Sequence, residues 1–291
     1  MPWGKQALQG RREPQSADIL GRVRTPQRAA GRAAWARQSF RTGPQVGKYT
    51  RVKLTVVGCS PAWPNPGGAQ SGYLVEGPGR VLLDCGPGVL ARLRAGEVWP
   101  SIDAIVVTHW HLDHWGDLVP WVWGAMVGPG RRAEQPELWL PPGGTERLAD
   151  FGTRLGWEDM FESVFSLREY ADARPFAAGG LEVTALELPH YLLQTFGVRV
   201  SDGDRTLAYS GDTGPSDRLV ELARDVDLFL CEATLERAEY DGAPRGHLSA
   251  DEAVEAFRAA GARRLLLTHR PQELSLGAGL EQVHDGLEVD V

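Results

Sequence analysis

The chain has 291 residues, of which 42% are hydrophobic and 24% are charged, values that are ordinary for a globular enzyme with an ample core. Its charge is divided unevenly: residues 1–51 carry eleven Lys and Arg against two acids, a net +9, whereas residues 52–291 carry 20 basic and 36 acidic residues, a net −16. A body this acidic repels long polyanions, which disfavours extended nucleic acid as a partner.

The first 48 residues combine scattered Arg, Gln, Gly and Pro with few large aliphatic side chains and no sustained period. This composition predicts disorder. Three interpretations stay open: a basic tail that contacts anions, a targeting segment, or translated sequence upstream of a true start at Val52. We therefore expect a disordered basic extension over residues 1–51 and one folded domain over residues 52–291.

From Val52 onward, short apolar runs end in glycine-rich turns, a pattern typical of strands. The first three predicted strands cover residues 53–57, 71–75 and 80–84. A Pro/Gly-rich loop follows the first of them, and Asp84 ends the third in front of two glycines. Residues 89–94 predict a helix that leads to the next strand.

The strongest chemical signal follows that strand. Residues 104–107 form a β-branched apolar run that is typical of a buried strand, and three histidines and a carboxylate follow within six residues: His109, His111, Asp113 and His114. Imidazole and carboxylate groups are ligands that suit a borderline metal such as zinc. The spacing allows His109 and His111 to converge on one ion while Asp113 and His114 are turned toward a second. The sequence therefore predicts a metal site.

Four tryptophans lie in and after this motif: Trp110, Trp115, Trp121 and Trp123. Beside a metal cleft they could stack a nucleobase or line an apolar pocket, and ordinary core packing is the alternative. A strand over residues 137–140, a helix over residues 144–155 and a connecting segment over residues 161–174 are expected next.

Four further strands each end at a polar side chain. They cover residues 181–188, 206–209, 227–230 and 264–267, and the side chains that follow them are His190, Asp212, Glu232 and His269. A further signal is His247, which lies two residues before Ser249. Ser249 and Glu252 form a Ser-x-x-Glu capping box that predicts a helix closed by Gly261. His247 therefore lies at a helix N-terminus, where free N–H groups favour an anion.

The His-x-His-x-Asp-His motif after an apolar strand resembles the signature of the metallo-β-lactamase fold superfamily. The later His, Asp and His occur in the order that this family shows, so the resemblance covers nearly all of residues 52–291. It implies an α/β fold of the αββα sandwich type, in which two mixed β-sheets face each other, helices cover the outside, and the metal ligands gather at one edge.

The resemblance also implies roles for the polar side chains. The first of two divalent ions would be held by His109, His111 and His190, and the second by Asp113, His114 and His269, with Asp212 bridging. Asp84 would support the metal loop. The ions are expected to be zinc, with Mn or Fe as alternatives, because His and Asp ligands serve these metals comparably.

A carboxylate as the bridging ligand resembles the phosphodiesterase members of the superfamily. The segment around His190 lacks the Gly-His-Thr-x-Gly-His pattern of thiolesterases and lactonases. His247 resembles the histidine with which RNase Z and its relatives contact the phosphate and assist the leaving oxygen. In that comparison Asp113 would orient or deprotonate the attacking water and Glu232 would orient His247.

RNase Z enzymes carry a long tRNA-binding arm between the positions that match His190 and Asp212, but these residues are only 22 apart here. The leading hypothesis is therefore hydrolysis of a small phosphodiester, a cyclic nucleotide such as 3′,5′-cAMP. The alternative is tRNA 3′-processing, with the basic tail replacing part of the arm. A lactonase or esterase would not need His247, and a non-catalytic binding protein would not need seven intact ligands.

Three cysteines, odd in number and without a C-x-x-C pair, favour buried thiols in a reducing cytoplasm: Cys59, Cys85 and Cys231. No signal-peptide pattern opens the chain, and its longest apolar stretch, residues 118–127, is too short to span a bilayer. We therefore expect a cytoplasmic protein without membrane contact. Whether the chain forms a homodimer stays open.

Overall fold

The computed structural model describes residues 52–128 and 135–291. The predicted basic extension, residues 1–51, lies outside these residues, so its disorder and its role stay predictions. Within the described residues, no helix is both long enough and apolar enough to cross a membrane. The three cysteines are buried free thiols, as the sequence predicts.

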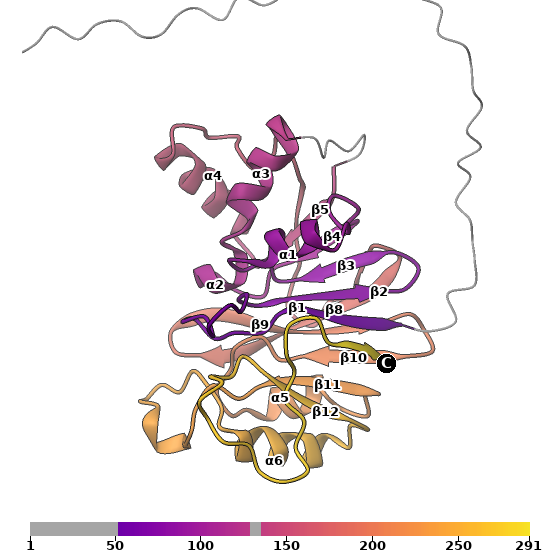
Figure 1. Cartoon of the computed structure of the whole chain (residues 1–291), viewed down its shortest axis with the longest axis vertical. Coiled ribbons are helices and arrows are strands. Elements are labelled where there is room, and N and C mark those ends of the chain that lie inside the picture. The colour runs from indigo at the N-terminus through magenta and orange to yellow at the C-terminus, as the bar shows by residue number, and fades with distance from the viewer. Residues whose placement is uncertain (1–51, 129–134) are drawn as a thin grey trace, which may run out of the picture. The chain divides into compact units, whose positions relative to one another are not determined.

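The described residues fold into two β-sheets that face each other (Figure 1). In order across the first sheet, the strands are β13 (Glu288–Asp290), β1 (Lys53–Gly58), β2 (Gly72–Glu76), β3 (Arg80–Leu83), β4 (Ala104–Val106), β5 (Glu137–Leu140) and β6 (Ser166–Glu169). Across the second sheet, they are β12 (Leu265–Thr268), β11 (Leu228–Glu232), β10 (Thr206–Tyr209), β9 (Leu193–Ser201), β8 (Leu181–His190) and β7 (Phe176–Ala178). Both sheets are mixed, which confirms the predicted sandwich.

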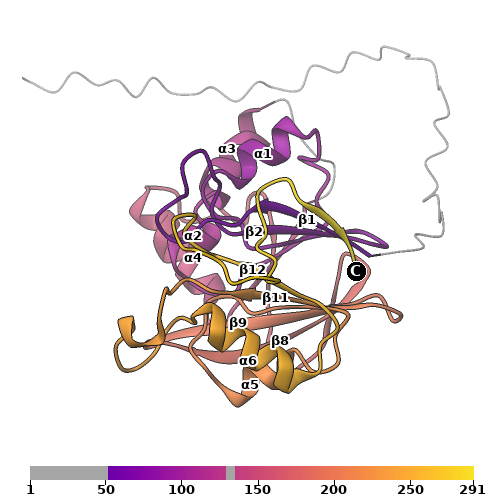
Figure 2. The ribbon, with the colours of Figure 1, turned by 60° about the horizontal axis from the view of Figure 1, so that its bottom comes forward.

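Helices cover the outer faces of both sheets. The first sheet carries α1 (Val89–Ala95), α2 (Leu112–Trp115), α3 (Leu118–Val127) and α4 (Gly144–Arg154). The second carries α5 (Asp217–Leu222) and α6 (Ala250–Ala260), which lie together under it in Figure 2, and a short 3₁₀ turn, η1 (Ala238–Tyr240), precedes α6.

Alternation along the strands divides the core into layers. In β1, Leu54 and Val56 belong to the cluster between the sheets, where they meet Val183 and Val198 of the second sheet. In β3, Val81 and Leu83 belong to the same cluster, whereas Leu82 between them belongs to the cluster under the helices of the first sheet. Because successive strand residues point to opposite faces, apolar residues on both parities are what a sheet covered on both faces requires.

The four tryptophans differ in burial. Trp115 and Trp121 are buried among the helices of the first sheet, whereas Trp123 is 53% exposed. Trp110 is half-buried and, with Trp115 and α4, lines a pocket of about 420 Å³. Core packing is therefore confirmed for Trp115 and Trp121, and the nucleobase role stays a prediction for Trp110.

Strand direction brings the predicted site together. β3 and β4 are parallel, and so are β10, β11 and β12, while β8 runs in the same direction as β10 because each pairs antiparallel with β9. The carboxyl ends of these strands therefore lie at one edge of each sheet. The polar residues that follow them meet across the sandwich.

Candidate metal centre

Two groups of side chains converge at that edge. The first contains His109, His111, His190 and Asp212, and the second contains Asp113, His114, Asp212 and His269. Six of these seven side chains are buried, and His111 lies at the surface. The structure thus brings together every residue that the sequence predicts as a metal ligand. Asp212 belongs to both groups, as expected for a bridging residue.

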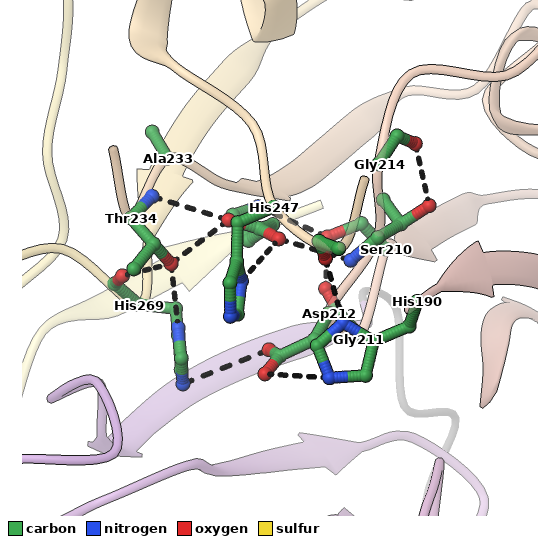
Figure 3. A network of polar contacts seen from close by, with 12 residues as sticks. His190, Ser210, Gly211, Asp212, Gly214, Ala233, Thr234, His247 and His269 are labelled. Carbon is green, nitrogen blue, oxygen red and sulfur yellow. Dashed lines mark hydrogen bonds and ion pairs between the residues drawn. The ribbon is translucent and has the colours of Figure 1, made fainter. Parts of the chain in front are cut away.

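The two oxygens of Asp212 face different groups. Oδ2 lies 3.7 Å from His109 Nε2 and 4.0 Å from His190 Nε2, whereas Oδ1 lies 3.3 Å from His114 Nε2 and 3.6 Å from His269 Nε2. Figure 3 shows the contacts of Asp212 with His190 and His269. Each oxygen can therefore bind a separate ion.

Neighbouring polar groups fix which ring nitrogen of each histidine carries the proton. His190 Nδ1 lies 2.6 Å from the Gly246 carbonyl oxygen and His114 Nδ1 lies 2.7 Å from Asp84 Oδ2, and both of these oxygens can only accept. In each neutral ring Nδ1–H is thus the donor, and Nε2 presents a lone pair to the site.

Two threonines act in the same way. The Thr108 hydroxyl donates to Asp84 and lies 3.0 Å from His109 Nδ1, so it accepts the proton of that nitrogen. The Thr234 hydroxyl lies 2.9 Å from Glu232 Oε2 and 2.8 Å from His269 Nδ1. When it donates to the Glu232 carboxylate, it too accepts from the imidazole. Sequence reasoning missed both threonines.

The donor set fits two metal ions. Nitrogen and oxygen ligands of a tetrahedral zinc, at about 2.0–2.1 Å from the ion, lie about 3.3 Å from one another. The corresponding separations here are similar. His111 Nδ1 lies 3.2 Å from His109 Nε2 and 3.0 Å from His190 Nε2, and Asp113 Oδ2 lies 3.2 Å from His269 Nε2. His114 Nε2 and Asp212 Oδ1 are buried and have no hydrogen-bond partner among the described residues, which is what an ion-binding atom requires.

Charge at the site also suits cations. Burial lowers the pKa of His109 and of His190, so both rings are neutral near pH 7, the form that binds a metal. Burial also acts to lower the pKa of His114, but the carboxylates around it, Asp212 first, raise that pKa well above its usual value. Carboxylates that stabilise a proton in this place would also stabilise a metal cation.

The carboxyl groups themselves are ionised. Burial acts to raise the pKa of Asp113 and of Asp212, but the surrounding imidazoles outweigh it and hold both pKa values below the usual range. The groups therefore offer anionic oxygens at neutral pH.

His247 lies beside both groups but has a different partner. Its ring packs 4.9 Å from that of His190 and 5.8 Å from that of His269, measured between centroids. Its Nδ1 lies 2.9 Å from Glu232 Oε1, so the contact expected between these two residues is present. Burial acts to lower the pKa of His247, but the charge of Glu232 and this hydrogen bond raise it to about 9. His247 is thus an imidazolium near pH 7.

Comparison with known proteins finds related sequences. Residues 79–270 match the family model described as a beta-lactamase superfamily domain. An uncharacterized protein of Mycobacterium tuberculosis is 37% identical over 230 residues, covering 77% of this chain and 83% of that protein. "Probable metallo-hydrolase YhfI" of Bacillus subtilis is 31% identical over 221 residues, covering 76% and 87% of the two chains. Ribonuclease Z of Myxococcus xanthus is 29% identical over 269 residues, covering 75% and 86%.

Solved structures agree on the fold. The crystal structure of YhfI from Bacillus subtilis superposes with a TM-score of 0.70 at 25% identity, covering 83% of this chain and all of that one (100%). Zn²⁺-bound PqqB from Methylobacterium extorquens gives a TM-score of 0.67 at 17% identity, covering 82% and 100% of the two chains. Yeast PDE1 gives 0.61 at 13% identity, covering 77% and 89%.

Proposed function

The chain belongs to the metallo-β-lactamase superfamily, and from this premise we propose that it is a metallo-hydrolase of that fold. The substrate that we propose is a small phosphodiester, with a cyclic nucleotide such as 3′,5′-cAMP as the leading candidate. The observation that carries the proposal is the position of His247. A protonated imidazole beside two metal-binding groups is suited to a reaction in which negative charge develops on a leaving oxygen.

The length of the connection between β8 and β10 supports a small substrate. β8 ends at His190, β9 begins at Leu193, and β10 begins at Thr206, so the two intervening turns have two and four residues. An arm that could hold a folded RNA does not fit between them. The net charge of −16 on residues 52–291 also opposes a long polyanion.

Roles for the residues follow from their positions. His109, His111 and His190 would hold one ion, Asp113, His114 and His269 the other, and Asp212 both. When bound, such a pair supplies a strong nucleophile near neutral pH and stabilises charge on the phosphoryl oxygens. Zinc is the expected metal, and Mn and Fe remain candidates.

The remaining groups handle protons. Asp113 is ionised and lies in the second group, so its carboxylate can orient the attacking water or accept its proton. His247 can give its Nε2 proton to the departing oxygen, while Glu232 holds Nδ1 and keeps the ring charged. Glu232 is itself fixed, because it also accepts from the backbone N–H of Thr213 and of Thr234.

The test is hydrolysis of 3′,5′-cAMP by the zinc-loaded full chain, with His111→Ala as the control and a 3′-extended tRNA precursor in parallel. Since His111 is exposed, its replacement should leave the fold intact. We expect cleavage of the cyclic nucleotide by the wild type and none by the variant. Cleavage of the precursor alone would favour the alternative of tRNA 3′-processing. Cleavage of neither, together with hydrolysis of simple esters or lactones, would refute a phosphodiesterase.

A further inference from the structure

Tyr191 is the first residue after the ligand candidate His190, and its backbone is unusual. It occupies the two-residue turn between β8 and β9 with φ at 51°, in the left-handed region that non-glycine residues rarely adopt. Such a conformation costs about 1 kcal/mol or more and persists where the surrounding structure fixes it, typically at functional sites. The strained backbone therefore makes Tyr191 a candidate functional residue.

Its surroundings hold Tyr191 in place. Its backbone N–H donates to the Arg245 carbonyl oxygen at 3.1 Å. Burial and the nearby Asp241 carboxylate raise the pKa of its hydroxyl to about 12. The same carboxylate accepts from the backbone N–H groups of Gly246 and His247 at 2.7 and 3.0 Å. The ring lies so close to Gly246 that a Cβ at that position would overlap its Cε2, Cζ and Cδ2 atoms. The ring thus has a fixed position, which only glycine at position 246 permits.

In this position the ring lies beside two histidines of the site and is partly exposed to solvent. Its centroid is 4.9 Å from that of His190 and 5.6 Å from that of His247. Tyr191 nevertheless remains 41% exposed, and the next residue, Leu192, is 93% exposed. Because these two residues make up the turn, what it offers to solvent beside His247 is mainly an aromatic and aliphatic surface.

We propose that Tyr191 is a substrate-recognition residue whose ring binds the nucleoside attached to the phosphate. The inference rests on the proposed function, because a phosphate held at the two groups of metal-binding side chains and His247 would place its organic substituent next to this ring. A flat nucleobase or ribose edge matches an apolar ring, whereas a second charged group does not. Tyr191 would therefore discriminate nucleotides from other phosphate esters.

The test compares two probes on the zinc-loaded full chain, adenosine 5′-monophosphate and inorganic phosphate, by isothermal titration calorimetry. Tyr191→Gly removes the ring but accepts φ of 51° without strain, so it should fold. We expect it to weaken binding of the nucleotide about 10-fold while phosphate affinity changes less than about twofold. Tyr191→Phe keeps the ring and should bind the nucleotide as the wild type does.

Gly246→Ala gives an independent check, because its methyl group must displace the ring without removing it. It should also weaken the nucleotide selectively. Equal affinity of the wild type for both probes, or equal weakening of both in Tyr191→Gly, would overturn the inference. Selective nucleotide binding through Tyr191 without cleavage of any phosphodiester would refute the proposed function alone. Cleavage of 3′,5′-cAMP that is unaffected in Tyr191→Gly would refute the role of Tyr191 alone.

Discussion

Thr234 shows how single side chains outside the ligand set prepare the site. Its hydroxyl lies between Glu232 and His269 and also approaches the His269 carbonyl oxygen at 2.9 Å. The chain of contacts from His247 through Glu232 and Thr234 to His269 therefore links the expected proton donor with a candidate metal ligand. Partners of this kind orient the ring and set its tautomer.

Replacing Thr234 by valine keeps the shape and removes the hydroxyl. We expect Thr234→Val to lower the affinity for one of two zinc ions about 10- to 100-fold, because His269 loses the acceptor that holds its Nδ1 proton. Competition titration with a chromophoric chelator measures both sites. Thr234→Ser, which restores a hydroxyl, should bind both ions nearly as the wild type does. Two unchanged affinities in the valine variant would show that Thr234 does not control His269.

Residue-scale prediction from sequence reached the candidate ligands and the supporting residues Asp84 and Glu232, but not the threonines or Tyr191. Asp84, His190, Asp212 and His269 each end a strand, and this local pattern is visible in the sequence. Thr234 meets His269 across 35 residues, and Tyr191 meets Gly246 across 55, so only the tertiary fold reveals these contacts. A signal for Tyr191 was still available, since a large residue in a two-residue hairpin turn is unusual.

Helix α6 carries the capping box that the sequence predicts. Ser249 Oγ accepts from the Glu252 N–H, Glu252 Oε2 accepts from the Ser249 N–H at 2.9 Å, and Gly261 closes the helix at φ of 68°. The Glu252 carboxylate also binds Arg245, so the cap fixes the segment that contains His247. Stability of this helix and placement of His247 are therefore connected.

Ser249→Ala should remove the cap at a cost of about 1 kcal/mol. For a folded body of this size that corresponds to a fall in the melting temperature of roughly 2–4 °C, measurable by circular dichroism. Ser249→Thr preserves a capping hydroxyl and should melt close to the wild type. A melting temperature in the alanine variant equal to that of the wild type would mean that Arg245 and Glu252 hold this end of α6 unaided.

Asp227 joins three strands of the second sheet at the edge opposite the metal centre. Its carboxylate accepts from the Thr206 N–H at 2.9 Å and from Arg205 and Arg263 at 2.8 and 2.7 Å, and these residues lie at the beginnings of β10 and β12. Burial acts to raise the pKa of Asp227, but the backbone hydrogen bond and the arginines lower it below its usual value. The stabilisation is therefore present above about pH 4 and is lost as the pH falls through the lowered pKa.

Asp227→Asn should lower the free energy of unfolding by about 1 kcal/mol at pH 7, because both arginines are largely exposed and the amide can still accept from Thr206. The difference from the wild type should shrink as the pH falls below 4. Urea unfolding at pH 7 and pH 3 measures both values. A difference that stays constant with pH would assign the loss to packing and not to charge.

Buried strands as short as β4 were predictable, whereas several elements at the sheet edges were not. β6 lies within the segment expected to be a connection, and its four residues are half-buried or exposed at the sheet edge. β13 has three residues and pairs only with β1, so it exists through tertiary contact. α3 is apolar on all sides, which hides the helical period on which such a prediction depends.

For the molecule as a whole, the candidate metal centre connects the two sheets. His109, His111, Asp113 and His114 follow β4 of the first sheet, whereas His190, Asp212 and His269 come from the second. Ions bound between them would tie the halves of the sandwich together, and any ligand that binds only the folded state stabilises it by mass action. Thermal stability is therefore a readout of metal binding that does not depend on the substrate.

At a free zinc concentration 100 times the dissociation constant, we expect about 2.7 kcal/mol of stabilisation and a melting temperature several degrees higher than after chelation with EDTA. His111→Ala is the matched variant, since His111 is the exposed member of its group and its loss removes a ligand without opening the core. After EDTA treatment its melting temperature should equal that of the wild type, but addition of zinc should raise its melting temperature less. An equal gain would place the stabilising ion away from His111, and His284, the one described histidine outside this edge, would be the residue to replace next.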